Sequence, residues 1–187
     1  AAEAMLDVCL ADIDAPPDLK RRILERADGN PLFIEQMSAT LRDTDVDLTS
    51  IPVPTGLSSL LTARLDQLDV ETRTVAQVAA VVGAEFDRGT LAALLPDGFP
   101  LDRHLTELLR RSVAVERRGS PGMLAFHHAL MREAAYSTML LRTRRQLHAR
   151  LAEYLTDSAP DAVQDIAMHL LEAGEAARAF PYLIAAG

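Results

Sequence analysis

The chain has 187 residues, of which 49% are hydrophobic, 25% are charged and 4% are aromatic, with no Trp. This length allows one large or two small globular cores, and the composition favours helix over sheet. We find no apolar run of about eighteen residues and no charged leader before an apolar stretch, so we expect neither a transmembrane helix nor a secretory signal. The single cysteine, Cys9, excludes an internal disulfide and fits a reducing cytoplasm.

The net charge of −8 is unevenly distributed along the chain. Residues 1–102 contain 8 basic and 18 acidic groups, residues 103–150 contain 10 and 3, and residues 151–187 contain 1 and 6. A basic middle between acidic ends can face polyphosphate, nucleic acid or its own acidic neighbours. For most of the individual arginines we expect solvation or pairing within the fold.

Residues 1–50 predict a small helical subdomain with a tight corner. A short helix over residues 4–10 is followed by Pro16-Pro17, which favours a new helix start. That second helix ends at Gly29, which suits a left-handed residue after a helix. Asn30 is a good N-cap and Pro31 a good first residue for a third helix, which ends near residue 42. The pattern therefore predicts two helices joined by a rigid corner.

Residues 55–142 predict a winged-helix domain. An extended stretch over residues 51–54 marks the boundary, since residues before proline avoid the helical conformation. We expect caps at Thr55, Asp69 and Asp87, a fourth helix over residues 101–111, and a helix-to-helix loop over residues 83–90. Alternating segments at residues 113–117 and 123–126 flank a Gly-Ser-Pro-Gly turn and predict a β-hairpin, and a helix follows over residues 128–141. Helices, a two-stranded ribbon and a further helix are the element order of a winged helix.

Residues 143–187 predict the start of an α-helical repeat array. The expected helices are a long one through Leu147 and Leu155, a second over residues 163–173, and a third from Glu175 onward. Gly174-Glu175-Ala176, with Ala179 and Tyr182-Leu183, resembles the opening of a tetratricopeptide-like repeat. A single repeat unit cannot bury its apolar face alone, so we expect the stack to continue and the chain to be a fragment. The fold class is mainly α, with a helical lid, a winged helix with a short hairpin, and a repeat start.

Two motifs resemble one family. Gly-Asn-Pro-Leu-Phe-Ile-Glu at residues 29–35, with residues 51–54 and 60–66 after it, resembles the lid of STAND-type ATPases, the AAA-related signalling ATPases found beside bacterial adenylate cyclases and LuxR-type regulators. In that family the lid proline packs on adenine. The resemblance therefore implies that Gly29, Asn30 and Pro31 contact a nucleotide, with Pro31 against the base.

The second motif is Phe-His-His-Ala-Leu-Met-Arg-Glu-Ala-Ala-Tyr at residues 126–136, which resembles the winged-helix segment of the same ATPases. The segment also resembles the Met-His-Asp motif of plant resistance and apoptosome proteins. In those proteins the histidine of the motif reaches the β-phosphate of bound ADP. The resemblance implies that His128 contacts phosphate and that Arg132 supports the site or pairs with an acidic neighbour. His127 departs from the bacterial pattern, which has Arg there. The alternative for His128 is a simple helix cap.

The sequence offers little other chemistry. It has no Walker-type phosphate loop, and no carboxylate pair or nucleophile can be argued, so we expect this segment to catalyse nothing by itself. The resemblance implies that ATP, ADP and Mg²⁺ are held with an upstream core. A metal site at His127-His128 is disfavoured by the spacing, no metal site is expected, and His148 and His169 are expected to stand alone on helix faces. A DNA-binding winged helix remains a competing hypothesis, in which the helix over residues 101–111, with His104 on it, and the wing face DNA. The arginines expected to contact DNA are Arg103, Arg110, Arg111, Arg117, Arg118.

The implied partners follow from the resemblance. They are the upstream nucleotide-binding core, other copies of the protein on activation, and an unknown inducer bound through the repeats, with no membrane. The function implied is the regulatory part of a signal-transducing or transcription-regulating ATPase. A protein-interaction scaffold is the third alternative.

Overall fold

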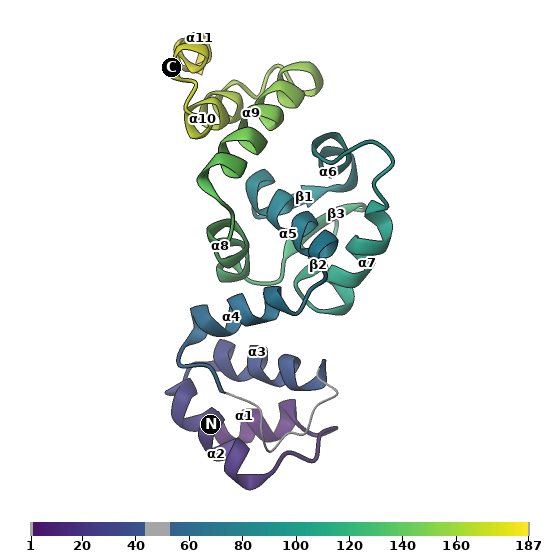
Figure 1. The fold of residues 1–187 in the computed structure, drawn as a ribbon, viewed down its shortest axis with the longest axis vertical. Coiled ribbons are helices and arrows are strands. Elements are labelled where there is room, and N and C mark those ends of the chain that lie inside the picture. Colours follow the sequence, from purple (N-terminus) through teal and green to yellow (C-terminus); the bar gives the residue numbers. More distant parts are fainter. Residues whose placement is uncertain (1, 44–52, 187) are drawn as a thin grey trace. The chain divides into compact units, whose positions relative to one another are not determined.

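The computed structural model describes residues 2–43 and 53–186. The chain divides into two compact units, residues 1–68 and 69–187, and each is described by itself. The fold is mainly α-helical with one small antiparallel sheet (Figure 1). Within the described residues, no helix is both long enough and apolar enough to cross a membrane.

The first unit is entirely helical in its described part. Its helices are α1 (Ala2–Cys9), α2 (Pro17–Ala27), α3 (Pro31–Arg42) and α4 (Leu57–Asp66). One apolar core joins them, in which the fully buried side chains include Leu6, Ile23, Phe33, Ile34 and Leu60. The sequence predicted a domain boundary at residues 51–54. In the structure α4 contributes Leu60 to the core of the first unit, so this unit extends to Leu68. Residues 51 and 52 of that expected extended stretch lie outside the described residues.

The start of α4 differs from the prediction. Thr55 was expected to cap it, but Gly56 occupies the N-cap position with extended backbone angles and no side-chain cap. The first helical residue is therefore Leu57, which packs against the core of the unit. The position of this apolar residue sets the helix start, and Thr55 lies one residue too early to cap it.

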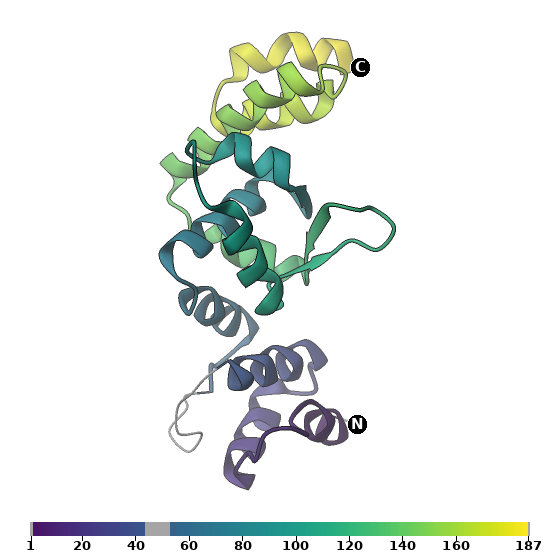
Figure 2. The ribbon, with the colours of Figure 1, turned by 90° about the vertical axis from the view of Figure 1, so that its right-hand side faces the viewer.

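The second unit begins with three helices and a small antiparallel sheet. Its first elements are α5 (Val70–Val82), β1 (Glu85–Asp87), α6 (Arg88–Leu94), α7 (Leu101–Arg110), β2 (Ala114–Glu116) and β3 (Met123–Phe126). As predicted, Asp69 and Asp87 cap α5 and α6, accepting the backbone N–H groups of Thr72 and Thr90. The β2–β3 hairpin is also confirmed, and Figure 2 shows its turn projecting away from the helices of this unit.

The sheet contains a strand that the sequence analysis missed. The order is β1-β3-β2 and all pairing is antiparallel, with Phe86 opposite Leu124 and Ala114 opposite Phe126. The prediction of a plain loop over residues 83–90 was therefore wrong. A strand of three residues shows no periodicity, and its partner lies far along the chain, so β1 becomes visible only in the folded unit.

The second unit ends in four more helices, α8 (Ala129–Ser137), α9 (Leu141–Ser158), α10 (Val163–Ala173) and α11 (Ala176–Ala186). The single helix predicted over residues 128–141 is broken after Ser137. Ser137 and Thr138 return hydroxyl hydrogen bonds to the carbonyls of Ala134 and Ala135, and Leu140 is extended. Such side-chain bonds compete with continuation of the helix. Beyond this break, α9, α10 and α11 share a small core around Ile166.

Candidate functional site

The corner between α2 and α3 forms as the sequence predicted. Asp28 and Gly29 both adopt left-handed backbone angles, with φ of 45° and 77°. Asn30 then accepts the N–H of Leu32 through its side-chain oxygen at 3.0 Å, and Pro31 is the first residue of α3. A β-carbon on Gly29 would meet no atom within 4 Å, so backbone conformation alone favours glycine there. The corner is fixed by local geometry.

The same corner presents its small residues to solvent while the next turn anchors it. Gly29, Asn30 and Pro31 are exposed, whereas Phe33 and Ile34 are buried in the core of the first unit. The ring of Pro31 is held at a fixed φ on a helix whose other face cannot move without opening that core. This arrangement suits a flat apolar contact with a planar ligand.

His128 lies at the junction between β3 and α8 in the second unit. It occupies the N-cap position with extended backbone angles, but its side chain accepts no N–H from the helix. His128 is therefore the N-cap residue, as the alternative interpretation expected, but its side chain makes no capping bond; its backbone carbonyl accepts the N–H of Met131. The ring packs against that of His127, with 4.4 Å between centroids.

Arg132, one turn further along α8, points toward α5. Its Nε donates to the carbonyl oxygen of Ala80 at 3.1 Å, which ties α8 to the C-terminal half of α5. No ion pair joins it to a described acidic neighbour, although the sequence analysis allowed one. His128 and Arg132 belong to the second unit, and Gly29, Asn30 and Pro31 belong to the first.

Arg132 also lines a pocket of about 470 Å³ that the sequence did not predict. Tyr136 of α8 hydrogen-bonds His148 of α9 through its hydroxyl group, with 2.9 Å from Oη to Nε2. The Nδ1 atoms of His148 and His169 are also 2.9 Å apart, so one ring donates to the other. The expectation that the two histidines stand alone is therefore wrong. They lie 21 residues apart in the sequence. The sequence indicates their burial only through the neighbouring leucines, Leu147 and Leu170, which are buried on the same helices.

Both imidazoles of this pocket are strongly buried, at 4% exposure each. Burial, followed by the positive charges of Arg132 and Arg144, lowers the pKa of His148 to about 4. Burial, followed by His148, lowers the pKa of His169 to about 4 as well, against the opposing effect of Asp165 and Glu172. Both rings are therefore neutral near pH 7, which lets each act as donor and acceptor at once.

The basic residues of α7 and of the β2–β3 hairpin are mostly engaged within the fold. Arg110 and Arg111 both donate to Glu107, and Arg117 pairs with Glu85 at 3.0 Å. These bonds, led by that of Arg110, lower the pKa of Glu107 to about 2, so its charge persists at neutral pH. Arg103 and Arg118 remain exposed.

His104, which was expected on the DNA-facing side of its helix, is only 1% exposed and cannot reach DNA. The described helix α7 therefore exposes no histidine. Arg110 and Arg111 already share the carboxylate of Glu107. This geometry weakens the DNA-binding alternative, because phosphate contacts depend on cations that are available to the backbone.

Comparison with known proteins adds one relative. No protein-family model matches the chain. It is 32% identical over 185 residues to the uncharacterized protein R02095 of Rhizobium meliloti (strain 1021). The match takes in 91% of this chain, and the chain spans 18% of the length of that relative.

Proposed function

We propose that this chain is the lid, winged-helix and first repeat segment of a cytoplasmic STAND-type signalling ATPase. In this proposal Pro31 packs on the adenine of bound ATP or ADP, and His128 contacts the phosphates. The upstream core supplies the phosphate loop, Mg²⁺ and hydrolysis, while this segment regulates the switch and catalyses nothing itself. The match to a relative that is several times longer is compatible with a segment of a larger polypeptide.

The observation that supports the lid assignment best is the geometry of the corner. An exposed proline stands at the first position of α3, with its φ locked and the following turn buried. Stacking on a planar base would then immobilise few bonds of the protein that are still free to rotate. The loss of conformational entropy that opposes the contact is therefore small.

The phosphate assignment rests on where His128 stands. It is the N-cap residue of a nine-residue helix, where backbone N–H groups and the helix dipole favour an anion. The imidazole of His128 can donate an N–H to a phosphate oxygen. Arg132 acts in this proposal as a positioning residue, because its bond to Ala80 holds α8 against α5.

The switch in this proposal is a change in whether the winged helix covers the nucleotide. ADP favours a closed state through the contact with His128, and ATP favours an open state. Such a two-state element needs only a ligand with different affinity for each state. The repeats beginning at α9 would then relay the inducer.

The lid contact is tested in the full-length parent by replacing Pro31 with Ala. Alanine is accepted at the first helical position, so α3 should form while the apolar ring is lost. We expect the affinity for a fluorescent ADP analogue to fall about fivefold, which corresponds to about 1 kcal/mol of lost apolar burial. The matched control is Pro17→Ala, which removes a proline from the same position of α2. Equal affinity of both variants and wild type would remove Pro31 from the nucleotide site.

A further inference from the structure

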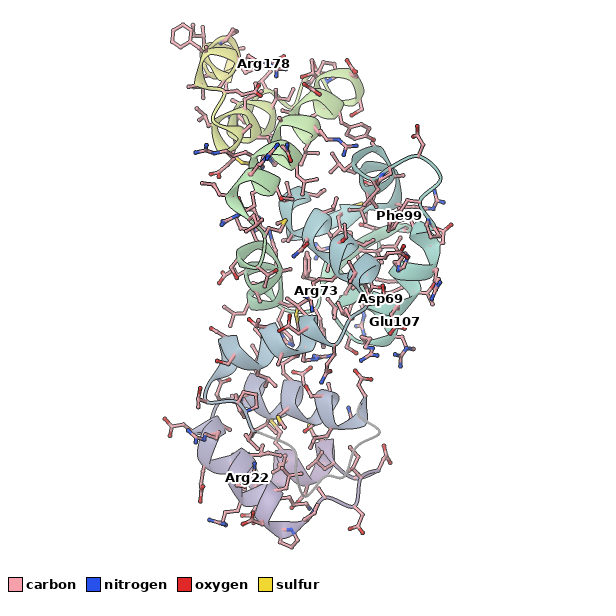
Figure 3. All side chains as sticks on the ribbon, in the orientation of Figure 1. Arg22, Asp69, Arg73, Phe99, Glu107 and Arg178 are labelled. Atoms are coloured by element: carbon pink, nitrogen blue, oxygen red, sulfur yellow. The ribbon has the colours of Figure 1, made fainter. Side chains whose placement is uncertain are left out.

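A cluster of three potential metal ligands lies between the start of α5 and the middle of α7. Asp69 and Glu71 come from the first turn of α5, and His104 comes from α7. One ligand atom of each lies within 4.8 Å of the others. Asp69 and His104 border a pocket of about 470 Å³, and Figure 3 labels two of its lining residues, Asp69 and Glu107.

The hydrogen bonds around His104 determine its tautomer. Thr72 Oγ1 donates its single proton to Asp69 Oδ2 at 2.7 Å, so it can only accept from the imidazole. His104 Nδ1 lies 2.8 Å from that oxygen and must therefore carry the proton. This leaves the lone pair of a neutral ring on Nε2. Proteins commonly orient a metal-binding histidine through hydrogen bonds to the ring nitrogen that does not bind the metal, and here Asp69 and the Thr72 hydroxyl hold Nδ1 in this way.

Nε2 of His104 is buried and makes no hydrogen bond. Glu71 Oε2 lies 3.2 Å away, yet off the direction that an N–H on Nε2 would need for a hydrogen bond. A carboxylate beside an imidazole lone pair repels it unless a cation lies between them. Two donors bound at 2.0–2.2 Å to one tetrahedral zinc ion stand about 3.3 Å apart, which matches this separation.

We propose that Asp69, Glu71 and His104 bind a divalent transition-metal ion of the zinc type. His104 supplies Nε2, the two carboxylates supply oxygen, and water from the pocket completes the coordination. Asp69 keeps lone pairs for this role, since its bonds to Thr72 use only part of its four acceptor sites. The ion fastens the first turn of α5 to α7, the helix that precedes the β2–β3 hairpin. This site does not depend on the nucleotide-binding proposal.

The test titrates zinc, and cobalt as a spectroscopic probe, into the chelator-treated 187-residue chain. We expect one equivalent to bind with the visible absorption of four-coordinate cobalt, and thermal unfolding to shift upward with zinc. Glu71→Gln should weaken zinc binding at least tenfold, and so should Asp69→Asn, in which asparagine still caps α5. Thr72→Val should weaken it about 10- to 100-fold through loss of orientation.

A control makes the test specific. Glu116→Gln removes an exposed carboxylate from β2, outside the cluster, and should bind zinc like wild type. The main rival is a charged His104 paired with Glu71. Equal zinc affinity of wild type and Glu71→Gln, or no binding by folded wild type, would overturn the proposal in favour of that ion pair.

Discussion

Asn30 determines where α3 begins, because its side chain accepts an N–H that the helix itself cannot satisfy. We predict that Asn30→Ala lowers the free energy of unfolding by about 1 kcal/mol, whereas Asn30→Ser, which can still cap, costs much less. Urea unfolding followed by circular dichroism measures both. Equal loss in the two variants would mean that the cap contributes nothing and that the amide acts elsewhere.

At the residue scale, helix caps were predictable from the sequence, whereas hydrogen bonds between side chains on different helices were not. Asn30, Asp69 and Asp87 bond to backbone groups two or three residues away, so the sequence contains the whole interaction. The bond between His148 and His169 joins two helices. Nothing in a single sequence states which faces of those helices meet.

At the element scale, the same distinction explains the errors. The strands β2 and β3 are joined by a glycine-rich turn and were predicted, whereas β1 pairs with a strand reached only after two helices. The break between α8 and α9 depends on hydroxyl bonds at Ser137 and Thr138 that helical periodicity does not report. Apolar spacing predicts that a helix exists more reliably than where it ends.

The buried histidine pair links α8, α9 and α10, and it should make the second unit sensitive to acid. The pKa of both rings is about 4 in the folded chain against about 6.5 when unfolded, so the unfolded chain binds more protons between these values. Their contribution is complete above pH 6.5 and is lost as the pH falls toward 4. We predict a loss on the order of 3 kcal/mol for each ring over that range.

Thermal unfolding at pH 7, 5.5 and 4.5 measures this dependence. Replacement of His169 by Gln keeps a hydrogen-bonding side chain without a titrating group, and it should flatten the pH profile. His128→Gln, which changes a histidine that does not line this pocket, serves as the control and should keep the wild-type slope. An unchanged slope in His169→Gln would show that acid acts through other groups.

At the scale of the whole molecule, the two proposed nucleotide contacts come from two separately packed units. Pro31 stands in the first unit and His128 in the second. A two-state switch needs a ligand whose affinity differs between the two states. The two motifs behind the proposed function are contiguous in the sequence, whereas the pocket lined by Arg132 and the cluster at His104 required the fold.

The most direct test of the account is the nucleotide content of the purified full-length parent. Wild type, His128→Ala and the neighbouring control His127→Ala are denatured, and released ADP is quantified by chromatography. We predict that wild type and His127→Ala retain close to one ADP per chain, while His128→Ala loses most of it and becomes constitutively active. Equal ADP in all three proteins would contradict a role for His128 at the phosphates and, with it, the proposed clamp.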